Sequence, residues 1–187
     1  VTVNQIILLY VIWKRIFKPF HRYQKYVLID MEPVYLDSEI AVVGLNSVRS
    51  FSFKEGRVNS EQLTKAVKIF RDQKKEVLKI IVSHHPFNVP SSHPGRPIGR
   101  ARMALKEFEN AKVDLLLSGH LHDNLHSHSD APYQIAHKGP LIIQAGTAIS
   151  RRLRREPNSF NVIVVSYPTV RVDRYSSKDS KTFVLEG

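Results

Sequence analysis

Two short apolar runs, each followed at once by histidines, constrain this chain more than any other feature. The run at 79–83 precedes a His-His-Pro triplet, and the run at 113–117 leads into a Ser-Gly-His-Leu-His segment. A short apolar run that stops at a turn is typical of a buried strand. Because open α/β sheets bind ligands beyond the carboxyl ends of their strands, we expect both groups of histidines at such an edge.

The spacing of these histidines indicates a metal or phosphate site. His120 and His122 are two residues apart, so in an extended chain their side chains point to the same side. Pro86 ends regular strand pairing directly after His84 and His85. The chain contains no cysteine, so a metal must be held by nitrogen or oxygen ligands, which suit Zn, Mn, Fe, Ni or Mg.

The other patterns predict an α/β chain whose last part consists of strands alone. Asn59, followed three residues later by Gln62, predicts a helix start, and an apolar stripe extends this helix to about residue 75. A second helix is expected at 100–111, and a loop at 88–99. Further strands are expected at 34–36, 40–45, 141–144, 160–167, 170–175 and 183–185.

Length and local composition favour one domain without a membrane span. The chain has 187 residues, which we interpret as a single domain over 1–187. The apolar run at 6–13 is far shorter than the roughly 20 residues needed to cross a bilayer. It lacks the basic start and small-residue cleavage site of a signal peptide, so we expect a buried strand or helix and a cytoplasmic location.

The net charge of +11 favours anionic partners such as phosphorylated small molecules, nucleic acid or anionic lipid. It fits a basic solvated surface equally well. Residues 10–26 interleave aromatic and basic residues, with Pro19 breaking any single helix. This pattern is typical of a helix with its apolar face on the core, and also of a stripe that binds nucleic acid or a membrane surface.

The order of the motifs resembles the calcineurin-like metallophosphoesterases, and in particular their bacterial members. A strand with His-His-Pro, a helix, a strand with Gly-His-x-His and a strand ending at Gly146-Thr147 follow one another. Segments 9–20, 145–154 and 158–161 are also similar. The resemblance implies a four-layer α/β/β/α sandwich of two mixed sheets. It further implies two divalent metal ions, and hydrolysis of phosphomonoester or phosphodiester bonds by a metal-activated water.

The resemblance also implies roles for individual residues. His84 and His120 would bind the second metal, and His122 the first. Asn4 corresponds to the metal-binding asparagine of a Gly-Asn-His-Asp/Glu motif, and Gln5 stands at its catalytic histidine. Glutamine can donate a hydrogen bond at that position, but it cannot deliver a proton as an imidazolium does.

Three further residues are candidates for catalysis or substrate binding. His85 is adjacent to a predicted ligand, so it would face substrate and act in catalysis, or else be a packed loop residue. Arg151 and Arg152 belong to a basic cluster that would clamp a phosphate or form a solvated turn.

Two upstream motifs of the family, Asp-x-His and Gly-Asp-x-x-Asp, have no counterpart here. We therefore expect the C-terminal portion of a metallophosphoesterase, incomplete at its N-terminus, with a partial site around the second metal. An uncovered sheet edge and apolar surface would favour self-association. Two functions stay open: a phosphoesterase using Mn, Fe, Zn or Ni, and a catalytically impaired module that binds metal, phosphate or nucleic acid.

Overall fold

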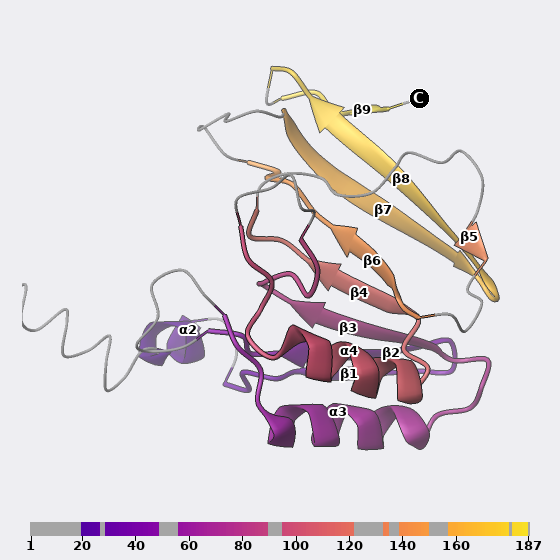
Figure 1. Ribbon diagram of the computed structural model, residues 1–187. Coiled ribbons are helices and arrows are strands. Elements are labelled where there is room, and N and C mark those ends of the chain that lie inside the picture. Colours follow the sequence, from indigo (N-terminus) through magenta and orange to yellow (C-terminus); the bar gives the residue numbers. More distant parts are fainter. Residues whose placement is uncertain are drawn as a thin grey trace, which may run out of the picture.

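The chain folds into a mixed α/β structure with two sheets, shown by a computed structural model in Figure 1. The structure describes residues 20–26, 29–48, 56–89, 95–121, 133–134, 139–149, 157–179 and 181–186. Its helices are α2 (His21–Tyr26), α3 (Ser60–Arg71) and α4 (Ala101–Asn110). Its strands are β1 (Val34–Leu36), β2 (Ile40–Leu45), β3 (Leu78–Ser83), β4 (Leu115–Ser118), β5 (Tyr133–Gln134), β6 (Leu141–Gln144), β7 (Asn158–Ser166), β8 (Thr169–Ser177) and β9 (Val184–Leu185).

The first sheet has five strands in the order β1-β2-β3-β4-β6. Strands β2, β3, β4 and β6 are parallel to one another, and the edge strand β1 is antiparallel to β2. The carboxyl ends of the four parallel strands therefore lie at one edge of the sheet, as the strand-end histidines require.

Helix α3 forms because its first turn is capped and one face is apolar. The side chain of Asn59 accepts a hydrogen bond from the backbone N–H of Gln62, and the Gln62 side chain accepts one from the backbone N–H of Asn59. This capping box confirms the predicted helix start. The helix ends at Arg71 rather than near residue 75, because the last buried apolar residue is Phe70 and polar residues follow.

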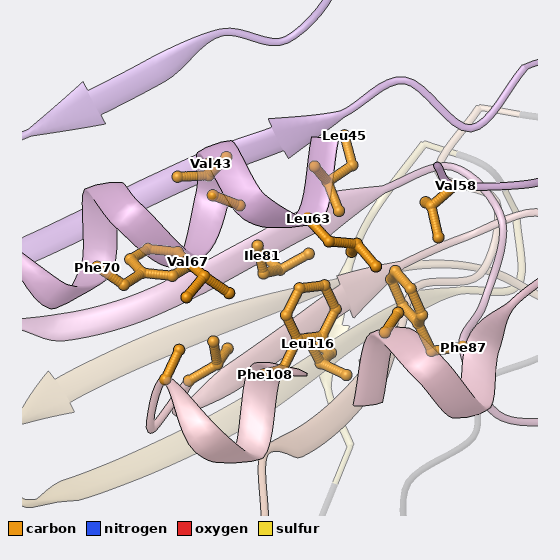
Figure 2. Close-up of a cluster of buried hydrophobic side chains, with 14 of the residues drawn as sticks. Val43, Leu45, Val58, Leu63, Val67, Phe70, Ile81, Phe87, Phe108 and Leu116 are labelled. Carbon is orange, nitrogen blue, oxygen red and sulfur yellow. The ribbon is translucent and has the colours of Figure 1, made fainter. Parts of the chain in front are cut away.

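The first sheet has an apolar core on each face. On one face, α3 and α4 pack against the sheet, and Phe70, Phe108 and Phe87 fill the space between them (Figure 2). Neighbouring residues in a strand point to opposite faces. Accordingly, Ile81 belongs to this helix-covered cluster, whereas Ile80 belongs to a second cluster on the other face.

The second sheet covers the face of the first sheet opposite the helices. Val170 on β8 is buried in the same cluster as Leu78, Ile80 and Leu115. The described layers are thus helices, mixed sheet and second sheet. The order of the second sheet is β5-β8-β7, with β9 also pairing with β8, and every described pairing is antiparallel. We expected two mixed sheets; the second is antiparallel because a tight turn joins its long strands β7 and β8.

Several apolar side chains lie on the surface. Tyr23 and Tyr26 on α2 are exposed, so the core-facing interpretation of the aromatic and basic segment does not hold for this helix. Val162 and Val164 on β7 are also exposed. They would contribute to the expected self-association, which stays a prediction. Among the described residues, no helix has the length and apolar character to cross a membrane.

Candidate metal centre

The ends of β3 and β4 bring two histidine-bearing segments together. The two strands pair in parallel, with Val82 opposite Leu117, so both segments leave the sheet at the same edge. The backbone N–H of Gly119 donates a hydrogen bond to the carbonyl oxygen of His84 at 3.2 Å. This bond joins the two segments immediately beyond the paired strands.

His120 lies at the centre of a tight turn. Its φ angle is +74°, and the N–H of Leu121 donates to the carbonyl oxygen of Gly119 at 3.0 Å. Such a three-residue turn with positive φ is rare, and the left-handed region costs a non-glycine residue about 1–2 kcal/mol. The strained turn carries the chain directly from β4 into a conformation that brings the His120 ring to His84.

The rings of His84 and His120 meet with nitrogen atoms facing each other. His120 Nδ1 and His84 Nε2 are 3.1 Å apart. Two nitrogens that bind one ion at about 2.1 Å are separated by about 3.0 Å at an octahedral angle and about 3.4 Å at a tetrahedral angle. The observed separation falls between these values, so this pair of donors fits a single metal ion.

His85 completes a group of three histidines. One ligand atom from each of His84, His85 and His120 lies within 4.8 Å of the other two. The three residues differ in their surroundings, because His84 is exposed, His120 is half-buried and His85 is buried. The His85 and His120 ring centroids are 4.5 Å apart.

Three neighbours fix His85 in place. The hydroxyl of Ser47, just beyond β2, lies 2.8 Å from His85 Nδ1. The hydroxyl of Ser83 donates to the backbone carbonyl of His85 at 2.8 Å. Gly56 lies against the ring, and a Cβ atom there would overlap the imidazole. His85 is therefore held through both its backbone and its ring.

The strand edge beside the histidines contains two buried oxygen atoms that lack hydrogen-bond partners within the described part of the chain. They are Ser118 Oγ on β4 and Gln144 Oε1 on β6, residues that stand opposite each other in the parallel pairing. The amide nitrogen of Gln144 donates to the carbonyl of Asn88. Since buried polar atoms are rarely left unpaired, this edge has spare acceptors for water or a ligand.

A polar hollow of about 340 Å³ lies beside Ser47 but does not contain the histidines. Asn46 and Val48 line it, whereas Ser47 between them contacts His85. Segment 46–48 thus contacts the hollow through Asn46 and Val48 and the histidine group through Ser47. The remaining lining residues are Glu32, Arg57, Val58, Asn59, Gln62 and Arg100.

The structure brings together three of the predicted site residues: His84, His85 and His120. The other candidates, Asn4, Gln5, His122, Arg151 and Arg152, lie outside the described residues. Sequence reasoning did not assign a role to Ser47 or Gly56. The available signal was the position of Ser47 just beyond a strand parallel to β3, at the edge where the histidines were expected. Nothing local marked Gly56 as a neighbour of His85.

Comparison of the sequence with models of known protein families finds no match, and comparison with curated proteins finds none.

Proposed function

We propose that this protein is a metal-dependent phosphoesterase of the calcineurin-like kind, which hydrolyses phosphomonoester or phosphodiester bonds. The observation that carries the proposal is the separation of 3.1 Å between His84 Nε2 and His120 Nδ1 at the carboxyl edge of a largely parallel sheet. The motif order of the sequence supports the same assignment. A four-layer α/β/β/α architecture and a cytoplasmic location are parts of this proposal that stay predictions.

The proposed roles of the three histidines follow from their surroundings. His84 and His120 hold an ion, since their nitrogens face one another and His84 is open to solvent. When bound, a divalent ion would supply Lewis-acid stabilisation of a phosphoryl group and activation of water. His85, buried beside them and held by Ser47, faces the substrate.

The resemblance supplies the remaining proposed roles. Asn4 and His122 would add metal ligands, and Gln5 would donate a hydrogen bond near the leaving group. Arg151 and Arg152 would bind the phosphate of the substrate. The identity of the ion stays open among Mn, Fe, Zn and Ni, because nitrogen and oxygen ligands accept each of them.

Metal content and hydrolysis test this proposal together. We expect purified protein to contain one or two ions per chain by elemental analysis, and to hydrolyse an aryl phosphate ester. Replacing His84 or His120 with Ala should remove at least one ion. It should also lower the hydrolysis rate by about a hundredfold or more, because the change removes a metal ligand itself and not merely a residue that orients one. His21→Ala is the matched control, since His21 lies on α2 outside the histidine group.

The number of metal ions per chain distinguishes a dinuclear centre from a site that holds one ion. Two ions per chain would support the dinuclear centre that the resemblance implies. One ion that disappears in His120→Ala would support a half-site around His84 and His120. Protein that contains no metal, takes up none from Mn²⁺ or Zn²⁺ solutions and releases no phosphate would reject the proposal.

The net charge of +11 supports a second candidate, a module that binds phosphate or nucleic acid without hydrolysing it. Such a module would bind a short oligonucleotide with an affinity that falls steeply as salt is raised. It would leave an aryl phosphate ester intact even with metal bound. Salt-dependent binding without turnover would therefore favour this function over the phosphoesterase.

A further inference from the structure

We propose that Ser47 is a positioning residue that holds His85 as a hydrogen-bond donor for a phosphoryl oxygen, with the ring hydrogen on Nε2. This assignment separates His85 from the metal-binding pair His84 and His120. The catalytic part rests on the proposed phosphoesterase function. The position of the ring hydrogen does not, and it can be measured in the absence of any activity.

The hydrogen-bonding capacity of the Ser47 hydroxyl gives the direction of the bond. A serine hydroxyl has one hydrogen to donate and two lone pairs that accept. Ser47 is 2% exposed. Among the described residues, its Oγ contacts His85 Nδ1 at 2.8 Å and the backbone N–H of His85 at 3.4 Å. The backbone N–H can only donate, so within the described part of the chain Nδ1 is the one acceptor for the hydroxyl hydrogen.

This direction fixes the form of the imidazole. If Nδ1 carried the ring hydrogen, the buried hydroxyl of Ser47 would have no acceptor among the described residues, and an unsatisfied buried hydroxyl destabilises the fold. Donation by Ser47 instead requires a lone pair on Nδ1. In a neutral imidazole the hydrogen is then on Nε2, which becomes a donor without a lone pair for a metal ion.

The surrounding backbone keeps the ring in this orientation. Gly56 lies against the His85 ring where any Cβ would overlap it. The backbone N–H of Arg57 donates to the carbonyl of Ser47 at 3.0 Å, which ties segments 46–48 and 56–58 together. Ser47 and Gly56 therefore approach the imidazole as parts of one connected backbone unit.

The ring form can be observed directly in the whole chain. Two-bond ¹H–¹⁵N correlation spectra distinguish a ring nitrogen that bears hydrogen from one that bears a lone pair. We would record them on ¹⁵N-histidine-labelled protein with Zn²⁺ as a diamagnetic probe, and assign His85 by its loss in His85→Asn. We expect Nδ1 to be the lone-pair nitrogen, and the ring to exchange between both forms in Ser47→Ala.

A matched serine provides the control for stability effects. Ser83 is also buried and also bonds His85, but through its backbone carbonyl rather than its ring. In Ser47→Ala we expect unchanged metal content and a kcat reduced by about tenfold. The His85 ring would no longer be held in place, so its hydrogen bond to the phosphoryl oxygen would be weakened mainly in the transition state. Ser83→Ala should leave the ring hydrogen on Nε2. Ser47→Thr, which keeps the hydroxyl, should also keep the hydrogen there, unlike Ser47→Ala.

The outcomes separate this inference from the proposed function. A hydrogen on Nδ1 in the wild-type chain would overturn the inference whatever the activity. Equal losses of kcat in Ser47→Ala and Ser83→Ala, with the ring form unchanged in both, would also overturn the inference. Ser47 would then have only a structural role. Absence of hydrolysis together with a ring hydrogen on Nε2 would reject the phosphoesterase while supporting the position of the hydrogen.

Discussion

His120 combines an unfavourable backbone conformation with a position in the histidine group. Its φ of +74° belongs to a region that glycine adopts readily and other residues rarely. Strained residues persist where the surrounding structure holds them, and they occur often at functional sites. Here the turn brings Nδ1 of His120 to within 3.1 Å of His84. The unfavourable backbone conformation of His120 is thus the cost of placing its ring beside His84.

Glycine at position 120 should therefore give a more stable chain than alanine there, and like alanine it should remove at least one metal ion. In the presence of a chelator, we expect His120→Gly to unfold with a free energy about 1 kcal/mol higher than His120→Ala, because only glycine is unstrained at this φ. Urea denaturation followed by circular dichroism measures the difference.

Lys112 provides the control for this comparison, since its φ of +56° is also positive and it lies outside the histidine group. Lys112→Gly should likewise be more stable than Lys112→Ala, but without loss of metal. A His120→Gly chain that is less stable than His120→Ala would mean that the turn is not strained.

At the scale of elements, the connection between β8 and β9 is organised by one carboxylate. Asp179 accepts hydrogen bonds from the backbone N–H groups of Thr182 and Lys181 and from the hydroxyl of Ser177. These bonds, that from Thr182 first, lower the pKa of Asp179 from 3.8 to about 2. The ionised carboxylate therefore stabilises the turn that returns the chain to β8.

The lowered pKa predicts a loss of stability in acid. The folded chain holds this carboxylate ionised at a pH where the unfolded chain has already protonated it, so the contribution is complete above about pH 4. It is lost as pH falls from the ordinary value of 3.8 toward about 2. Thermal unfolding of Asp179→Asn across this range should show a smaller decline than the wild-type chain. Parallel curves for the two proteins would contradict the assignment.

At the scale of the whole molecule, two apolar clusters pack on opposite faces of the first sheet and share its central strands. The cluster under the helices contains Phe108, and the cluster between the sheets contains Val170. Both clusters take alternate residues from the same strands, such as Leu115 and Leu116 on β4. Packing on either face therefore supports the same central strands.

Because the two clusters share these strands, we expect core substitutions on either face to destabilise one cooperative unit. Phe108→Ala should lower the free energy of unfolding by about 3–5 kcal/mol and Val170→Ala by about 2 kcal/mol, since both side chains are fully buried. Urea denaturation should show a single transition in each variant. Val162→Ala, at an exposed position on β7, is the control and should change little. Two separate transitions would mean that the sheets fold independently.

The sequence by itself determined the local elements. Periodicity and capping predicted α3 and α4, β1 to β4, β6 and the β7–β8 hairpin, because these signals come from residues a few positions apart. The histidines were also expected at strand ends, and His84 and His120 do follow β3 and β4. The two-residue strand β5 was not predicted, since so short a segment carries almost no pattern.

Only the tertiary structure decided which side chains meet. His84 and His120 are 36 residues apart, and Ser47 and His85 are 38 apart. Their contacts depend on strand order and register, which no local pattern specifies. The same holds for the Gly56 backbone against the His85 ring and for the packing of Val170 between the sheets. The sequence thus identified the chemistry available at the strand ends. The parallel alignment of β2, β3 and β4 assembled that chemistry into one site.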